Sequence, residues 1–192
     1  CVGVAQRACA NGDSVEVKVN GITRVVAGDT IANSVSLIMA QADGSFMVAG
    51  VLHDQIVSQR FSHVGLPFGD PVIVDTDKTW PIAEHNQIDL LELTDGRYVI
   101  SWSSTSAQDG DNYSVIARVF EVDGTPATAE VVLSQYHSKK QQHVRLANSP
   151  DENNGDFIAI WQSDAADGDD WAVMGRHFNR DAQPLADEFQ VY

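Results

Sequence analysis

Aspartate residues cluster in two short stretches of the chain, one around Gly110 and one around Gly168. The candidate metal ligands in these stretches are Asp109, Asp111, Asp164, Asp167 and Asp169. Carboxylate oxygens grouped at a glycine turn can coordinate calcium. The spacing differs from that of an EF-hand loop, which also needs a glutamate at its end. Calcium is therefore the candidate cofactor, and a solvated acidic turn is the alternative interpretation.

One aromatic residue borders each acidic stretch. Tyr113 follows the first stretch and Trp171 follows the second. We expect these two side chains to contact a ligand bound at the loops, and packing against neighbouring residues is the alternative. Trp102 and Trp161 could also offer flat surfaces for a sugar, but their recurrence at one place in two repeats favours packing in the core.

The sequence contains no motif of a known catalytic site. A nucleophile elbow, a phosphate-binding loop and a paired-cysteine motif are all absent, and the six histidines show no metal-ligand spacing. No catalytic residue is therefore predicted. A carboxylate pair for glycoside hydrolysis stays open, because such a pair is defined by distance in space.

The acidic stretches belong to a pattern that recurs along the chain. An extended run ends in a turn containing Gly or Ala four times, at Gly12, Gly65, Gly124 and Ala182. The intervals are about 50–60 residues, and a fixed period of this size is typical of repeat arrays.

Each full repeat also holds an Asp-Gly or Asn-Gly pair, followed by a run of β-forming residues that begins at Phe46, Tyr98 or Phe157. Such pairs favour tight hairpin turns. No segment shows sustained helical periodicity. The expected strands are 34–39, 46–51, 55–61 and 71–75 in the first full unit, 87–93, 98–103, 113–120 and 130–134 in the second, and 142–147, 157–162, 171–178 and 188–192 in the third.

Four antiparallel strands per repeat are typical of a propeller blade. The sequence therefore predicts an all-β fold of repeated four-stranded antiparallel units, β-propeller-like, with about three and a half blades. Residues 34–79, 80–137 and 138–192 form three blade units of one array domain. Residues 1–33 form the C-terminal half of a blade plus a linker, with strands at 2–10 and 15–20. Because an open ring leaves exposed strand edges, we expect the remainder of a longer chain or a second copy to complete the ring.

Aromatic residues that recur in phase on these strands form the predicted core. A residue and its fourth neighbour along a strand share one face of the sheet. The residues expected to be buried are Phe46, Phe61, Tyr98, Trp102, Phe120, Phe157, Trp161 and Phe178.

The composition argues against a nucleic-acid partner and against a membrane-spanning helix. The 192 residues include 27 acidic and 12 basic side chains, which gives a formal net charge of −15. Binding to nucleic acid requires a basic surface, so this charge argues against a nucleic-acid partner. No apolar run is long enough to span a membrane. An acidic surface fits a secreted or high-salt setting or cation binding, and it fits solubility alone equally well.

Two units share one order of landmarks. The third unit carries Gly155, Phe157, Trp161-Gln162-Ser163, Asp167-Gly168, Arg176, Phe178 and Ala182-Gln183-Pro184. The second unit carries Gly96, Tyr98, Trp102-Ser103-Ser104, Asp109-Gly110, Arg118, Phe120 and Gly124-Thr125-Pro126. The first unit departs: Gly50 replaces the tryptophan and the acidic loop is shortened to Leu52-His53-Asp54, although Gln59-Arg60-Phe61 is kept.

This order of landmarks resembles a repeat that is common in large bacterial secreted and surface proteins, including calcium-dependent repeats-in-toxin adhesins. The resemblance covers nearly the whole chain. It implies a propeller-like array in an extracellular protein, and it implies no catalytic residues.

Two classes of function follow from the sequence. The first is a non-catalytic binding or structural module of an extracellular or cell-surface protein, with a role in adhesion and with calcium, a glycan or another surface molecule as its ligand. The second is a propeller enzyme acting on polysaccharide, either a glycoside hydrolase or a lyase. The regular repeats favour the first class. The break in the first unit, at Gly50 and His53, keeps the second class open.

Overall fold

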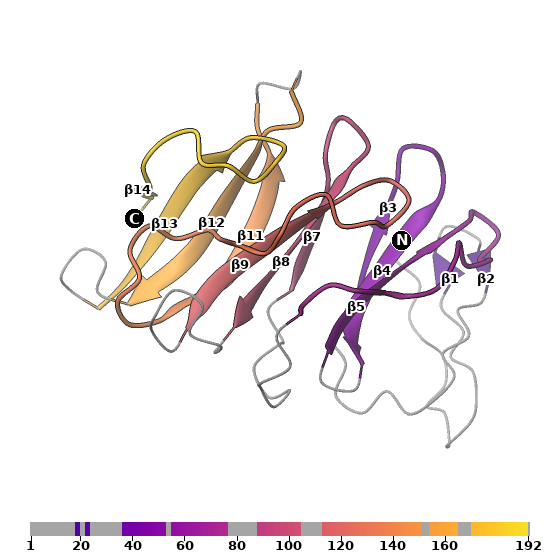
Figure 1. The fold of residues 1–192 in the computed structure, drawn as a ribbon, viewed down its shortest axis with the longest axis horizontal. Coiled ribbons are helices and arrows are strands. Elements are labelled where there is room, and N and C mark those ends of the chain that lie inside the picture. The colour runs from indigo at the N-terminus through magenta and orange to yellow at the C-terminus, as the bar shows by residue number, and fades with distance from the viewer. Residues whose placement is uncertain are drawn as a thin grey trace.

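The computed structural model of the chain describes residues 18–19, 22–23, 36–52, 55–76, 88–104, 113–150, 154–164 and 170–191. These residues form three four-stranded antiparallel sheets and one two-stranded sheet, and they contain no helix. Figure 1 shows the three larger sheets side by side in chain order, from indigo to yellow. The prediction of an all-β fold built from repeated four-stranded antiparallel units is therefore confirmed.

Each large sheet is an up-and-down meander of four strands that are consecutive in sequence. Unit 1 contains β3 (Ser36–Ala40), β4 (Phe46–Leu52), β5 (Gln55–Phe61) and β6 (Val72–Ile73). Unit 2 contains β7 (Asp89–Glu92), β8 (Tyr98–Ser104), β9 (Ser114–Phe120) and β10 (Val131–Val132). Unit 3 contains β11 (Gln141–Asn148), β12 (Phe157–Asp164), β13 (Trp171–Phe178) and β14 (Phe189–Gln190). All the strands expected in the three full units are thus present, although the fourth strand of each unit is shorter than expected.

The N-terminal part of the chain is described only in a small hairpin. Strand β1 (Lys18–Val19) pairs antiparallel with β2 (Ile22–Thr23). The strand expected at 2–10 lies outside the described residues. The described part of the strand expected at 15–20 is β1, and its partner β2 was not among the predicted strands.

Tight turns connect the strands where the sequence predicted them. In unit 1, Asp43 Oδ1 accepts a hydrogen bond from the backbone N–H of Ser45 at 2.9 Å, and Gly44 has a φ of 84°. The recurring second turn also needs positive φ, which is 94° at Gly124 and 56° at Ala182. Alanine therefore occupies a backbone conformation that favours glycine, so the third unit keeps the turn despite the substitution.

A stacked aromatic pair recurs in every unit. The ring centroids of Tyr98 and Phe120 lie 5.1 Å apart, and those of Phe157 and Phe178 lie 5.3 Å apart. In each unit the two residues are direct cross-strand partners. Unit 1 has the same arrangement, with Phe46 and Phe61 at 5.2 Å. The three sheets therefore share one register as well as one strand order.

One hydrophobic cluster fills the space between unit 1 and unit 2. It joins Ala49 and Ile56 of unit 1 to Ile100 and Trp102 of unit 2, and all four side chains are buried. Tyr98, Ile100 and Trp102 alternate along β8 and so share the face that points to unit 1. We call this side of a sheet its preceding face, because it packs on the unit that comes earlier in the chain.

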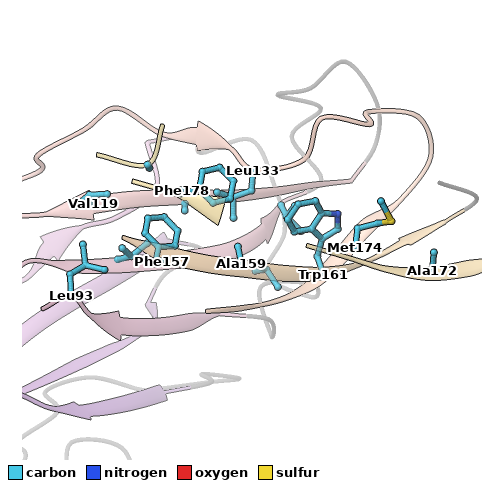
Figure 2. Close-up of a cluster of buried hydrophobic side chains, with 14 residues drawn as sticks. Leu93, Val119, Leu133, Phe157, Ala159, Trp161, Ala172, Met174 and Phe178 are labelled. Atoms are coloured by element: carbon cyan, nitrogen blue, oxygen red, sulfur yellow. The ribbon is translucent and has the colours of Figure 1, made fainter. Parts of the chain in front are cut away.

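A second hydrophobic cluster fills the space between unit 2 and unit 3. Figure 2 shows Val119 and Leu133 of unit 2 packed with Phe157 and Trp161 of unit 3. Val119 lies on the opposite side of its sheet from Phe120, and we call that side the following face. The eight aromatic residues predicted to form the core are all buried, from 0% exposure for Tyr98 to 8% for Phe61.

The described sheets do not close a ring, so the propeller arrangement stays a prediction. The search for a membrane-spanning helix, made over the same part of the chain, found none of sufficient length and apolar character.

Candidate ligand-binding loops and unit junctions

One end of units 2 and 3 holds the candidate site residues that the structure describes. Asp164 is the last residue of β12 and pairs across the strands with Trp171, the first residue of β13. Tyr113 directly precedes β9 at the same end of unit 2. Tyr113 and Trp171 are therefore equivalent residues of adjacent units. The candidates Asp109, Asp111, Asp167 and Asp169 lie outside the described residues.

Two adjacent lysines lie against these candidates. Lys139 Nζ is 3.6 Å from Asp164 Oδ1, and Lys140 Nζ is 4.5 Å from the centroid of the Tyr113 ring. The backbone carbonyl of Lys140 accepts a hydrogen bond from the N–H of Asp164 at 2.8 Å. Neither lysine was a sequence candidate. The available signal was a pair of neighbouring cations in a chain with only 12 basic residues.

The lysines change the electrostatics of the predicted calcium loops. An ammonium group beside Asp164 neutralises part of the charge that would attract a metal ion. Within the described ranges, no group of three or more His, Cys, Asp or Glu side chains is placed to hold a metal. A metal ion at Asp164 would therefore compete with Lys139 for the carboxylate.

The two edge aromatics differ in exposure. Trp171 is 49% exposed, whereas Tyr113 is half-buried beneath Lys140 of the following unit. A large indole ring in contact with water beside a carboxylate can stack on an apolar sugar face while the carboxylate accepts hydroxyl hydrogen bonds. Of the two, Trp171 presents the larger open aromatic surface.

Arginine side chains form a recurring contact at the junctions between units. Arg118 Nη1 donates to the carbonyl of Val74 in unit 1 at 3.0 Å, and its Nε donates to the carbonyl of Thr128 at 3.0 Å. In unit 3, Arg176 Nη1 donates to the carbonyl of Leu133 in unit 2 at 3.5 Å. The planar guanidinium can reach two carbonyls at once because its donors point in different directions. The arginine two residues before the stacked phenylalanine therefore ties its unit to the preceding one.

Glutamate side chains form a second recurring junction contact. Glu130 Oε1 accepts hydrogen bonds from the backbone N–H and the hydroxyl of Thr76, at 2.6 and 2.7 Å. Glu188 accepts hydrogen bonds from the backbone N–H groups of Gln135 and Tyr136, at 2.8 and 3.2 Å. Both glutamates directly precede the fourth strand of their units. Each one satisfies backbone donors just after the fourth strand of the unit before it.

Unit 1 lacks both junction residues. Gln59 occupies the position of Arg118, and its Nε2 donates to the carbonyl of Phe68 in its own unit at 3.1 Å. Pro71 occupies the position of Glu130, and Gly50 occupies the position of Trp102. The preceding face of unit 1 therefore differs from those of units 2 and 3 at three positions.

A further set of contacts joins the units at the opposite end of the sheets. Arg60 Nη1 of unit 1 donates to the carbonyl of Val122 in unit 2 at 3.0 Å. Arg97 Nη1 of unit 2 lies 2.9 Å from Asp181 Oδ1 of unit 3. Hydrogen bonds from Ser45 and the nearby Arg60 lower the pKa of Asp43, so this carboxylate stays charged in the turn.

Comparisons with known proteins give one weak structural likeness. The chain matches no protein-family model and no curated protein. It resembles the crystal structure of an endo-arabinase from Bacteroides thetaiotaomicron, with 15% identity and a TM-score of 0.44. The match covers 83% of this chain and 64% of the arabinase chain, so this chain spans less than two thirds of that protein's length. A likeness at this level does not identify an activity.

Proposed function

We propose that the chain is a non-catalytic structural and binding repeat module of an extracellular or cell-surface protein. The observation that carries this proposal is the recurring use of charged side chains to join units. Arg118, Arg176, Glu130 and Glu188 are repeated in register, and each donates to or accepts from the backbone of the preceding unit. Repeat proteins are stabilised by such nearest-neighbour interfaces. These residues therefore serve the array rather than a reaction.

The binding role is assigned to the loop end of units 2 and 3. Trp171 offers an exposed ring there, next to Asp164, and the acidic stretches around Gly110 and Gly168 begin at this end of the sheets. A glycan is the favoured ligand, because an aromatic ring with neighbouring carboxylates matches the mixed apolar and hydroxyl surface of a sugar. Calcium bound by the loop aspartates is the proposed cofactor of this site.

A glycan array followed by titration tests the carbohydrate part of the proposal. We expect Trp171→Ala to abolish glycan binding and Tyr113→Ala to weaken it. Leu185→Ala is a matched control, because Leu185 is also exposed on unit 3 but lies near the opposite end of β13. Binding that survives Trp171→Ala unchanged would rule out this site.

Thermal unfolding in the presence of calcium tests the cofactor. Calcium that binds only the folded chain stabilises it by mass action, by about 2.7 kcal/mol at a concentration of 100 Kd. We expect Asp164→Asn and Asp169→Asn to reduce the rise in Tm. An equal Tm in millimolar calcium and in chelator would leave the aspartates as solvated turn residues.

A polysaccharide-acting enzyme is the second candidate. The irregular preceding face of unit 1, with Gly50, Gln59 and Pro71, is the observation in its favour, because a catalytic site needs a local break in a regular array. Product analysis after incubation with a panel of polysaccharides separates the two candidates. Release of saturated or unsaturated oligosaccharides would identify a hydrolase or a lyase and would overturn the non-catalytic proposal.

A further inference from the structure

The following face of unit 3 is exposed where the same face of units 1 and 2 is buried. Val191 lies at the position of Val74 and Leu133, because all three donate to the equivalent carbonyl of the third strand. Val74 and Leu133 are 0% exposed, whereas Val191 is 53% exposed. The difference arises because units 1 and 2 each have a following unit packed on this face.

The exposed face keeps the apolar character of a junction. Ile160 is 38% exposed, although its equivalents Ala49 and Ser101 are fully buried. Phe189 is 41% exposed and its ring lies against Gly175, where an added Cβ would be only 2.9 Å from the ring. Together with Val191 these side chains form one apolar patch on the outer side of β12, β13 and β14, which we call the unit 3 outer patch. A patch of this kind on a soluble protein marks an interaction site.

We propose that the unit 3 outer patch binds a further four-stranded unit of the same repeat. The occupant carries an arginine two residues before its stacked phenylalanine, a glutamate directly before its fourth strand and a tryptophan at the position of Trp161. Its arginine donates to the carbonyl of Val191, as Arg118 donates to Val74 and Arg176 to Leu133. The surface continues the interface that already joins units 1, 2 and 3.

A second copy of this chain does not provide the required surface. The preceding faces of units 2 and 3 are occupied within the chain, so among the three described units only unit 1 could offer its preceding face in a second copy. That face has Gln59 in place of the arginine, Pro71 in place of the glutamate and Gly50 in place of the tryptophan. Gln59 reaches only carbonyls of its own unit. The occupant is therefore a unit distinct from unit 1.

An extended chain tests the proposal directly. A copy of residues 75–133 is joined after Val191. Val191 occupies the position of Val74, so the added copy follows it with the same linker that joins unit 1 to unit 2. The copy brings the residues Trp102, Arg118 and Glu130. Hydroxyl-radical footprinting with mass spectrometry reports the reactivity of Ile160, Phe189 and Val191 in peptides that occur once in the extended chain. We expect their oxidation to fall several-fold relative to the unextended chain.

In the matched control, the added copy carries Arg118→Gln and Glu130→Pro. These substitutions give it the residues that unit 1 has at the same positions, Gln59 and Pro71. We expect it to protect the unit 3 outer patch less than the unchanged copy does, and equal protection would exclude the two contacts as the basis of recognition. An added unit that leaves Phe189 and Val191 as reactive as before overturns the proposal. So does an added unit that remains unfolded by circular dichroism, because docking on this face must stabilise it.

The unextended chain provides an independent measurement. Light scattering across a range of protein concentrations, combined with the same footprinting, reports whether copies associate through this face. We expect Phe189 and Val191 to remain reactive at all concentrations. A dimer or ring of copies in which both residues become protected would assign the patch to a second copy and overturn the proposal.

Discussion

Nη1 of Arg118 lies 3.0 Å from the backbone carbonyl of Val74, which belongs to the preceding sheet. The same guanidinium donates through Nε to the carbonyl of Thr128 at 3.0 Å, and it lies 5.7 Å from the centre of the Phe120 ring. Val74 is fully buried, so its carbonyl has little access to water. One side chain thus satisfies acceptors in two units and holds them in one relative position.

Replacing Arg118 with glutamine is expected to destabilise the chain by about 1–3 kcal/mol, because a charge-assisted hydrogen bond to a buried carbonyl is lost. Arg145→Gln is the matched control. Arg145 is exposed and donates to the carbonyl of its sequence neighbour Val144, so its replacement should change stability by less than about 0.5 kcal/mol. Urea unfolding followed by circular dichroism measures both variants. Equal losses for the two would contradict a special role for the junction arginine.

Replacing Trp161 with alanine is expected to lower the free energy of unfolding by about 3–5 kcal/mol, because removing this large buried side chain leaves a cavity between units 2 and 3. Trp161 is 1% exposed and packs with Leu133 and Met174 in the second cluster (Figure 2). Trp171→Ala in the same unit removes an exposed ring and should cost far less. Denaturant melts of both variants give the comparison, and a loss below about 1 kcal/mol for Trp161→Ala would place this residue outside the core.

The repeating β pattern could be predicted from sequence because its signals are local. Turn pairs such as Asn154-Gly155 and the apolar runs after them fix the strands, and the recurrence of Phe157 and Phe178 fixes their register. These features depend on neighbours in the chain. The strand order and the buried aromatic residues therefore follow without any knowledge of how units pack.

The junctions could not be predicted in the same way, because they depend on a neighbouring unit. The similarity between Gln59-Arg60-Phe61 and the later arginine motif hides a shift of one residue. Arg60 directly precedes Phe61 and so lies on the following face, where it reaches Val122, whereas Arg118 lies on the preceding face. Lys140 was missed for a related reason, because its contact with Tyr113 forms only where unit 3 meets unit 2.

Two turn glycines are expected to respond differently to alanine. Gly44 has a φ of 84° with nothing within 4 Å of an added Cβ, so Gly44→Ala should cost only the backbone strain of about 1 kcal/mol. Gly155 has a φ of 73°, and an added Cβ would lie 3.2 Å from both Arg180 Cβ and Asp95 Oδ2. Gly155→Ala should therefore cost about 2–3 kcal/mol. Thermal and urea unfolding of the two variants measure this difference, and a larger loss for Gly44→Ala would contradict the unit 2–unit 3 contact at Asp95.

Burial of Tyr98 predicts a loss of stability at high pH. Loss of hydration raises the pKa of its phenol from its ordinary value of 10.0 to about 12, because the charged phenolate would be buried between units 1 and 2. Below pH 10 the phenol is protonated in both the folded and the unfolded chain, so the free energy of unfolding does not depend on it. Between pH 10 and 12 the unfolded chain releases this proton and the folded chain retains it. The contribution of Tyr98 to the free energy of unfolding should therefore fall by about 2–3 kcal/mol across this window.

Tyr98→Phe keeps the ring stacked on Phe120 and removes the ionisable group, so the comparison isolates this one residue. Urea unfolding of both proteins at intervals from pH 9 to 12 measures it, with the wild-type chain losing stability relative to Tyr98→Phe as the pH rises. A difference between the two proteins that stays constant over the whole range would mean that the phenol is open to water and that the units separate at this position.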